Sequence, residues 1–143
     1  MIALFSSSVG DSRFTQVSSR GIVSGMIHES QIRQVAVQLG TAAQALQVIL
    51  FGSYARGEAT ERSDVDLMVV AQTDLPRHKR AVGLYKQFRP YPFGMDIVVY
   101  TPQEVQEGKR SALTFVSTVL REGKTLYERR EGSGQTVVGE SRE

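Results

Sequence analysis

One stretch, VILFGSYARGEATERSDVDLMVV (residues 48–70), limits what this chain can fold into more than any other. Two apolar, β-branched runs of strand length enclose a polar segment, which predicts two buried strands joined by a turn. A Gly-Ser pair, Gly52 and Ser53, follows the first run, and an Asp-x-Asp pair, Asp64 and Asp66, opens the second run after ten intervening residues. Two carboxylates at the start of an otherwise apolar strand require an explanation other than packing.

The spacing of these carboxylates allows a metal site, although the pair alone is more simply explained by a turn. In an extended segment, residues two apart point to the same side, so Asp64 and Asp66 project from one face and Val65 and Leu67 point to the core. Like charges this close repel each other, and a hard divalent cation would remove the repulsion. The alternative is that Asp64 caps a turn and Asp66 is an ordinary charge at a strand start. Asp96 favours the metal, because a carboxylate in the middle of the apolar strand FGMDIVVY is costly to bury unless it is paired or metal-bound.

Apolar periodicity predicts alternating helices and strands along the rest of the chain. The expected helices are 30–39, a short one near 54–58, 77–89, one opened by Pro102, and 111–123; the expected strands are 47–51, 66–71, 93–100 and 124–128. We expect Ser30 to cap the first helix and Gly40 to end it. We expect Leu113, Val116 and Leu120 to share one face of the last helix. The order predicts an α/β (α+β) fold, a small mixed β-sheet with helices mainly on one face and the other face partly open.

The length and composition fit one compact domain. Of the 143 residues, we expect 1–25 to be a flexible N-terminal extension, 26–128 the domain and 129–143 a flexible C-terminal tail; Met26 is a hypothetical translation start. The net charge of +2 gives no argument for nucleic acid. The absence of Cys excludes disulfides and thiolate metal sites and is typical of a cytoplasmic protein. No apolar run approaches the roughly 18 residues of a membrane span, so no membrane partner is expected.

The Gly-Ser pair is a candidate phosphate site. Gly52 permits a backbone geometry and a close approach that a Cβ would block, and Ser53 could cap the short helix that follows. Free N–H groups at that point suit a phosphate, although a simple turn is the alternative. Arg56 could reach a phosphate with its fixed, bidentate donors. We interpret Arg62 as a solvated loop charge and Ser63 as a residue that steadies the turn.

One segment, residues 76–90, carries several basic residues and no acid. It could dock an acidic partner or a nucleic acid backbone, but a solvated helix face is the preferred interpretation. His28 and His78 have no metal-ligand spacing, and the aromatic residues form no stacking platform for bases. Nucleic acid is therefore not an expected partner.

GSYARGEATERSDVDLMVV followed by MDIVVY resembles the minimal nucleotidyltransferases of the DNA polymerase β-like superfamily. Their pattern is Gly-Ser, ten residues, Asp-x-Asp, and a third carboxylate on a later strand; the resemblance covers about residues 30–128. It implies the polymerase β-like nucleotidyltransferase fold and an enzyme that transfers a nucleoside monophosphate from a nucleoside triphosphate, with two Mg²⁺ ions and release of pyrophosphate. The residues carried over are the catalytic and metal-binding Asp64, Asp66 and Asp96 and the nucleotide-binding Gly52, Ser53 and Arg56.

The resemblance is nearest to minimal nucleotidyltransferases that act as antitoxins beside a HEPN-type ribonuclease toxin. It implies ATP as the substrate and transfer of AMP (AMPylation) to a tyrosine of that partner toxin. Two alternatives stay open: a binding antitoxin that masks its partner without catalysis, and nucleotidyl transfer to a small molecule such as an aminoglycoside.

Overall fold

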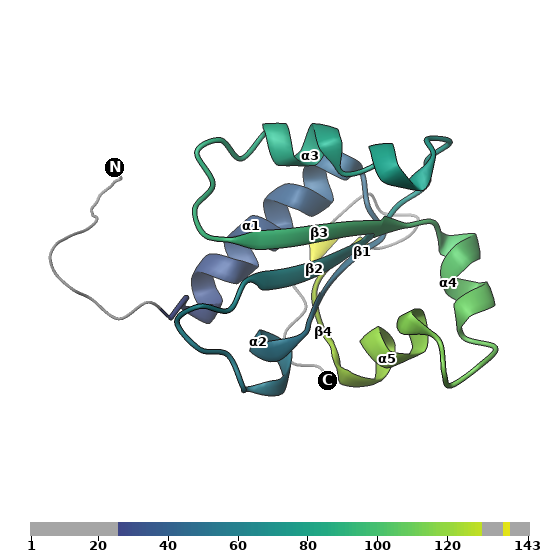
Figure 1. The fold of residues 1–143 in the computed structure, drawn as a ribbon. Helices are drawn as coiled ribbons and strands as arrows, with labels where there is room; N and C mark the ends of the chain where they lie inside the picture. Colours follow the sequence, from purple (N-terminus) through teal and green to yellow (C-terminus); the bar gives the residue numbers. More distant parts are fainter. Residues whose placement is uncertain (1–25, 130–135, 138–143) are drawn as a thin grey trace, which may run out of the picture.

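A single mixed sheet forms the centre of the molecule (Figure 1). The computed structural model describes residues 26–129 and 136–137. The strands are β1 Gln47–Phe51, β2 Val65–Val70, β3 Met95–Tyr100, β4 Lys124–Arg129 and β5 Thr136–Val137, in the sheet order β3-β2-β1-β4-β5. β2 and β3 run parallel, and the other neighbouring strands run antiparallel. The prediction of a small mixed sheet is confirmed.

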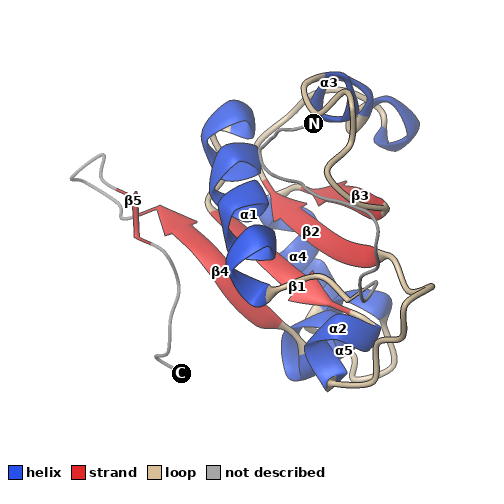
Figure 2. Ribbon diagram, turned by 90° about the vertical axis from the view of Figure 1, so that its left-hand side faces the viewer, coloured by secondary structure: helices blue, strands red, loops and turns tan. Residues whose placement is uncertain are grey.

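Helices lie on both faces of this sheet. They are α1 Glu29–Ala43, α2 Ser53–Arg56, the 3-10 turn η1 Arg77–Lys79, α3 Val82–Lys86, α4 Pro102–Gly108 and α5 Phe115–Glu122. α1 and α3 pack on one face, while α4 and α5 cover part of the other face (Figure 2). No helix in the described part of the chain is long and apolar enough to cross a membrane.

The two faces of β2 bury two separate apolar clusters. Val65, Leu67 and Val69 belong to the larger cluster with α1 and α3, whereas Met68 and Val70 join the smaller cluster with α4 and α5. Every residue of β2 except Asp66 is buried. A strand packed on both faces reads as a nearly continuous apolar run, which is why one polar residue in it is conspicuous.

The C-terminal end of the domain reaches beyond its expected boundary at residue 128. β5 comes from the predicted tail, and its residues pair with Glu128 and Arg129 at the end of β4. That part of the tail therefore belongs to the sheet. The predicted extension, residues 1–25, lies outside the described residues.

α1 is longer than its sequence pattern predicts. The N–H of His28 donates to Oε1 of Gln31 at 3.1 Å, so His28 is the N-cap and the prediction of Ser30 is wrong. Gly40 lies inside the helix instead of ending it. The ring of Tyr127 occupies the space that a Cβ at position 40 would need, so glycine is present here for packing.

The predicted helix over residues 77–89 is broken into η1 and α3. Arg80 lies between the two pieces, and its guanidinium donates to the carbonyl of Val99 at 3.1 Å and to Oε1 of Glu104 at 2.8 Å. These partners are distant in sequence. The apolar spacing of residues 77–89 therefore could not predict the contacts of Arg80 at the break.

The last helix begins later than predicted. The hydroxyl of Thr114 accepts the N–H of Ser117 at 3.1 Å, which makes Thr114 the N-cap of α5. Leu113 precedes this cap and is 94% exposed, so its predicted place beside Val116 on a buried face is wrong. Gly123 ends the helix as expected.

Candidate functional site

Asp66 and Asp96 lie side by side at the starts of β2 and β3. They are direct partners in the parallel ladder, and the charge of Asp96 acts on the ionisation of Asp66. β3 begins at Met95, so Asp96 is the second residue of its strand, not a mid-strand residue as the sequence predicts, and it is exposed. Asp66 and Asp96 therefore lie next to each other as predicted, at the end of the sheet where β2 and β3 begin.

Asp64 lies beside this pair but faces a different neighbour. Its Oδ1 rests where a Cβ on Gly94 would be, and the N–H of Val65 donates to the Gly94 carbonyl at 2.9 Å. Among the described residues, no three Asp, Glu or His side chains converge as a ready-made metal site. The structure therefore pairs Asp66 with Asp96 and leaves Asp64 next to them.

The acidic pair is electrostatically unbalanced. Burial, together with the charges of Asp96 and Asp64, raises the pKa of Asp66 from its ordinary 3.8 to about 6, although Arg56 opposes the shift. A nearby cation would remove this penalty, because it would favour the ionised form. Carboxylate oxygens are the donors that Mg²⁺ prefers, so the chemistry of the donor set fits that ion.

Gly52 brings the backbone of the β1–α2 turn against the Asp66 carboxylate. Its φ of +77° lies in the left-handed region, and Oδ2 of Asp66 occupies the place of a Cβ. Gly52 is the N-cap of α2, and its carbonyl accepts the N–H groups of Ala55 and Arg56 at 3.0 and 3.1 Å. Ser53 is the first helical residue, so its prediction as the cap is wrong. Its N–H has no partner within the helix, and Ser53 lines the same pocket as Asp66.

Arg56 is held by two acids at the side of α2. Its Nε donates to Oε1 of Glu58 at 2.9 Å, and its Nη1 lies 3.8 Å from Oε1 of Glu122 on α5. The hydrogen bond with Glu58 raises the pKa of Arg56 above its ordinary value. The guanidinium is near Asp66, as a nucleotide-binding role requires, but it is already engaged.

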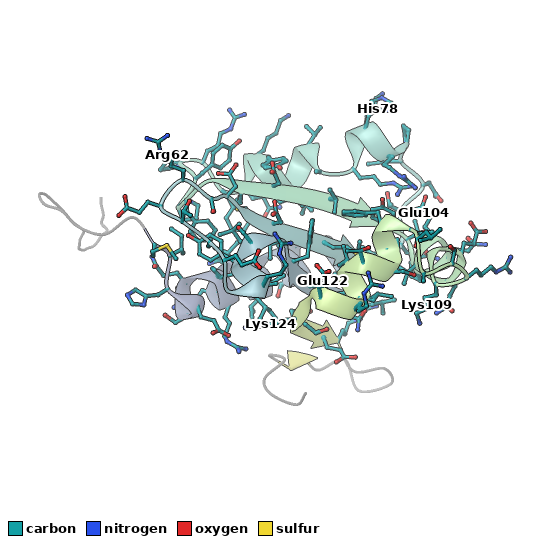
Figure 3. The ribbon with its side chains drawn as sticks, turned by 60° about the horizontal axis from the view of Figure 1, so that its bottom comes forward. Arg62, His78, Glu104, Lys109, Glu122 and Lys124 are labelled. Carbon is teal, nitrogen blue, oxygen red and sulfur yellow. The ribbon has the colours of Figure 1, made fainter. Side chains whose placement is uncertain are left out.

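The loop before β2 contains the two remaining predicted residues. Oγ of Ser63 accepts the N–H of Thr60 at 2.8 Å, which confirms that Ser63 steadies the turn ahead of Asp64. Arg62 is exposed and projects from the edge of the molecule, well away from Glu122 (Figure 3). Its interpretation as a solvated loop charge agrees with this position.

A pocket of about 420 Å³ opens directly beside Asp66. The Gly52–Ser53 turn and Arg56 form one wall, and α5 forms the opposite wall. α5 contributes the residues Phe115, Thr118, Val119 and Glu122, whose spacing places them on one face of the helix. The sequence gives no signal for this wall, because its aromatic residues are expected to form no stacking platform.

Two further neighbours of the acidic pair were also missed. Gly94 permits the approach of Asp64, and a glycine one residue before the start of a strand was its only sequence signal. Tyr85 accepts the N–H of Ile97 at 2.7 Å with its hydroxyl, which fixes the outer edge of β3 one residue from Asp96. Nothing in the sequence marks this contact, because Tyr85 occupies an ordinary helical core spacing.

Sequence comparison matches the chain to one family. The model of the family described as "Polymerase beta, Nucleotidyltransferase" matches residues 33–132. Two proteins of Methanocaldococcus jannaschii, each named "putative protein adenylyltransferase", are 36% identical over 92 residues and 35% identical over 81 residues. The first match covers 59% of this chain and 59% of the relative, and the second covers 57% and 77%. The chain thus spans less than two thirds of the first relative's length.

Solved structures give partial overlaps. A crystal structure of a "putative nucleotidyltransferase" from Sulfolobus solfataricus has a TM-score of 0.49 and 19% identity, over 72% of this chain and 82% of that one. A structure described as a "toxin-antitoxin with AMP-PNP" has a TM-score of 0.41 and 20% identity, over 65% and 70%. The sequence matches are the stronger indication.

Proposed function

The chain belongs to the polymerase beta nucleotidyltransferase family, and from that premise we propose that it is a magnesium-dependent protein adenylyltransferase. It moves AMP from ATP to a protein hydroxyl, a tyrosine of a HEPN-type ribonuclease toxin, and acts as the antitoxin of that partner. The relatives named as protein adenylyltransferases support a protein acceptor. The tyrosine and the toxin come from the resemblance in the sequence, and the cytoplasmic location comes from the absence of Cys.

The observation that carries this proposal is the Asp66–Asp96 pair beside Gly52. In the proposal, Asp64, Asp66 and Asp96 hold Mg²⁺, which supplies charge compensation for the phosphates. The Gly52–Ser53 turn gives the triphosphate a close backbone approach, because no Cβ stands between the turn and the carboxylates.

The transfer itself exchanges one phosphorus–oxygen bond for another. The tyrosine oxygen bonds to the α-phosphorus, the bond from the α-phosphorus to the bridging oxygen breaks, and pyrophosphate leaves. Asp96 is the exposed carboxylate of the pair, so it is the residue placed to receive the hydroxyl proton. In the proposal, the Arg56 guanidinium leaves Glu58 or Glu122 and donates to a phosphate instead.

The test combines α-labelled ATP, Mg²⁺ and the purified product of the adjacent gene. We expect label on that protein, release of pyrophosphate, and AMP on a tyrosine by mass spectrometry. The double variant Asp64→Asn/Asp66→Asn should transfer nothing, whereas Arg62→Ala, which changes an exposed loop charge, should retain activity. Absence of label with the unmodified protein would contradict the proposal.

A second candidate is a binding antitoxin that masks its partner without turnover. The observation in its favour is that Asp64 faces Gly94, so the described residues do not form a converged three-ligand site. The same double variant separates the two functions. Neutralisation of the partner that survives in Asp64→Asn/Asp66→Asn would favour masking over catalysis.

A further inference from the structure

The pocket beside Asp66 has a wall that the proposed chemistry does not yet use. The face of α5 lies across from the Gly52–Ser53 turn, and both ribbon views place α2 and α5 next to each other (Figures 1 and 2). The pocket volume of about 420 Å³ falls within the roughly 300–1,000 Å³ of small-molecule sites. Since Asp66 itself lines this pocket, a ligand held at Asp66 has room to extend along it.

Phe115 presents an aromatic surface in this pocket. Its side chain lines the pocket and is 45% exposed, although α5 is anchored by the buried Val116 and Val119. Phe51 meets the ring edge-on with the centroids 5.4 Å apart, and Tyr100 lies at 6.0 Å and 31°. Two ring contacts hold Phe115 in place. A large, fixed and partly exposed ring at the end of a reactive site is suited to stacking.

The charges decide which part of a nucleotide lies at α5. Glu122 is negative and would repel the phosphates. Its cationic neighbour is Arg56, whose Nη1 lies 3.8 Å from Oε1 of Glu122. The remaining surface that α5 gives to the pocket comes from Phe115, Thr118 and Val119, which carry no charge. The uncharged nucleoside therefore fits the α5 wall, and the phosphates fit the end beside the proposed magnesium ligands.

We propose that the pocket face of α5 binds the nucleoside half of the substrate and that Phe115 stacks on its base. This inference rests on the proposed nucleotide transfer and adds the residue that recognises the base. Stacking on a phenyl ring is tolerant of base identity, since every base has a π-face. The Phe115 contact therefore contributes affinity for nucleotides in general.

The test compares two ligands that share their phosphates and differ in the nucleoside. The affinities of ATP and of inorganic tripolyphosphate are measured by calorimetry with Mg²⁺ for the unmodified protein and for Phe115→Ala. We expect ATP to bind about tenfold more weakly to the variant, as for the loss of one stacked base, and tripolyphosphate to bind unchanged. Phe115→Trp should restore ATP affinity. Leu113→Ala, which removes an exposed apolar side chain outside the pocket, is the matched control.

The outcomes separate this inference from the proposed function. Unchanged ATP affinity in Phe115→Ala, or an equal loss for both ligands, would overturn the stacking role. An unmodified protein that binds ATP no more tightly than tripolyphosphate would also overturn it. If the unmodified protein bound neither ligand, both proposals would fail. If stacking were found as expected but no label were transferred to a partner, the proposed function would fail and the nucleoside site would stand.

Discussion

The two ends of β3 use acidic side chains in opposite ways. At the start of the strand, Asp96 stands against Asp66, and the pKa of Asp66 is raised to about 6 by burial and by its acidic neighbours. Just past the other end, Glu104 accepts a hydrogen bond from Arg80 at 2.8 Å, and this partner lowers the pKa of Glu104 to about 2. One end carries uncompensated charge and the other carries compensated charge.

The compensated end serves the fold. Arg80 joins three segments, because it also donates to the carbonyls of Leu75 and Val99. Arg77 adds a 3.2 Å ion pair to Glu104, and its guanidinium lies 4.7 Å from the ring centre of Tyr100. Two basic residues of the segment 76–90 therefore hold β3 and α4 together. Glu104 at this end is paired with two arginines, whereas no ion pair among the described residues reaches Asp66 or Asp96, which indicates a site for a ligand at the opposite end.

The largest expected effect comes from removing a charge at the uncompensated end. In Asp96→Asn, nucleotide transfer should fall by about a hundredfold or more, because a group that acts in the transition state is lost. The unfolding midpoint should not fall, since the change relieves repulsion. Transfer assays and thermal melts measure the two effects. Retained transfer would show that Asp96 does not take part.

A smaller effect is expected for the turn that approaches this end. Gly52→Ala places a Cβ on the Asp66 carboxylate at a φ of +77°, so it should lose about 1–3 kcal/mol of unfolding free energy together with activity. Gly57→Ala is the milder comparison, because Gly57 has a φ of +75° in the αL region, which other residues can adopt, and no atom within 4 Å of the added Cβ. Urea denaturation compares the variants. Equal losses would mean that only backbone strain matters and that the contact with Asp66 does not.

At the compensated end, the expected effect is on stability alone. Arg80→Met should lower the unfolding free energy by about 1–2 kcal/mol, because Glu104 loses its main partner and the Val99 carbonyl loses a donor. Nucleotide affinity should stay the same. Arg77→Met should cost less, since that side chain is 60% exposed. A loss of nucleotide binding in Arg80→Met would show that the two ends are coupled.

The smallest effect is a pH dependence of opposite sign at the two ends. The pKa of Glu104 is lowered from its ordinary 4.5 to about 2, so its ionised form stabilises the fold at pH values above 4.5. This contribution is lost as the pH falls toward 2. The stability advantage of the unmodified protein over Glu104→Gln should therefore shrink as the pH falls.

The raised pKa of Asp66 destabilises the fold as the pH rises from 3.8 through about 6, so Asp66→Asn should gain relative stability over that range. Denaturation at several pH values measures both trends. Parallel trends for the two variants would contradict the contrast.

The sequence predicts the elements whose cause is local. β1 has the predicted limits 47–51, because a short apolar run next to a Gly-Ser turn contains all the information needed. The approach of Asp66 and Asp96 is also predicted, since alternation on two strands puts both on one face. Gly52 is identified for the correct reason, namely a backbone geometry that a Cβ would block.

The rest depends on contacts between distant residues. The break in the helix 77–89 accompanies the contact of Arg80 with Glu104, and Gly40 fails to end α1 because Tyr127 packs on it. The pocket wall on α5 forms only when that helix folds back beside α2, so no spacing rule could place Phe115 near Asp66. Periodicity records which side of an element is apolar and does not record which neighbour it meets.

The most direct test of the central claim is the melting temperature of the unmodified protein and of Asp66→Asn at neutral pH, with and without Mg²⁺. The account holds that the acids at the start of β2 and β3 repel each other until a cation binds. Without Mg²⁺, Asp66→Asn should therefore melt at a higher temperature than the unmodified protein. Added Mg²⁺ should raise the melting temperature of the unmodified protein and leave that of the variant unchanged. A variant that melts lower, with no effect of Mg²⁺ on either protein, would contradict the account.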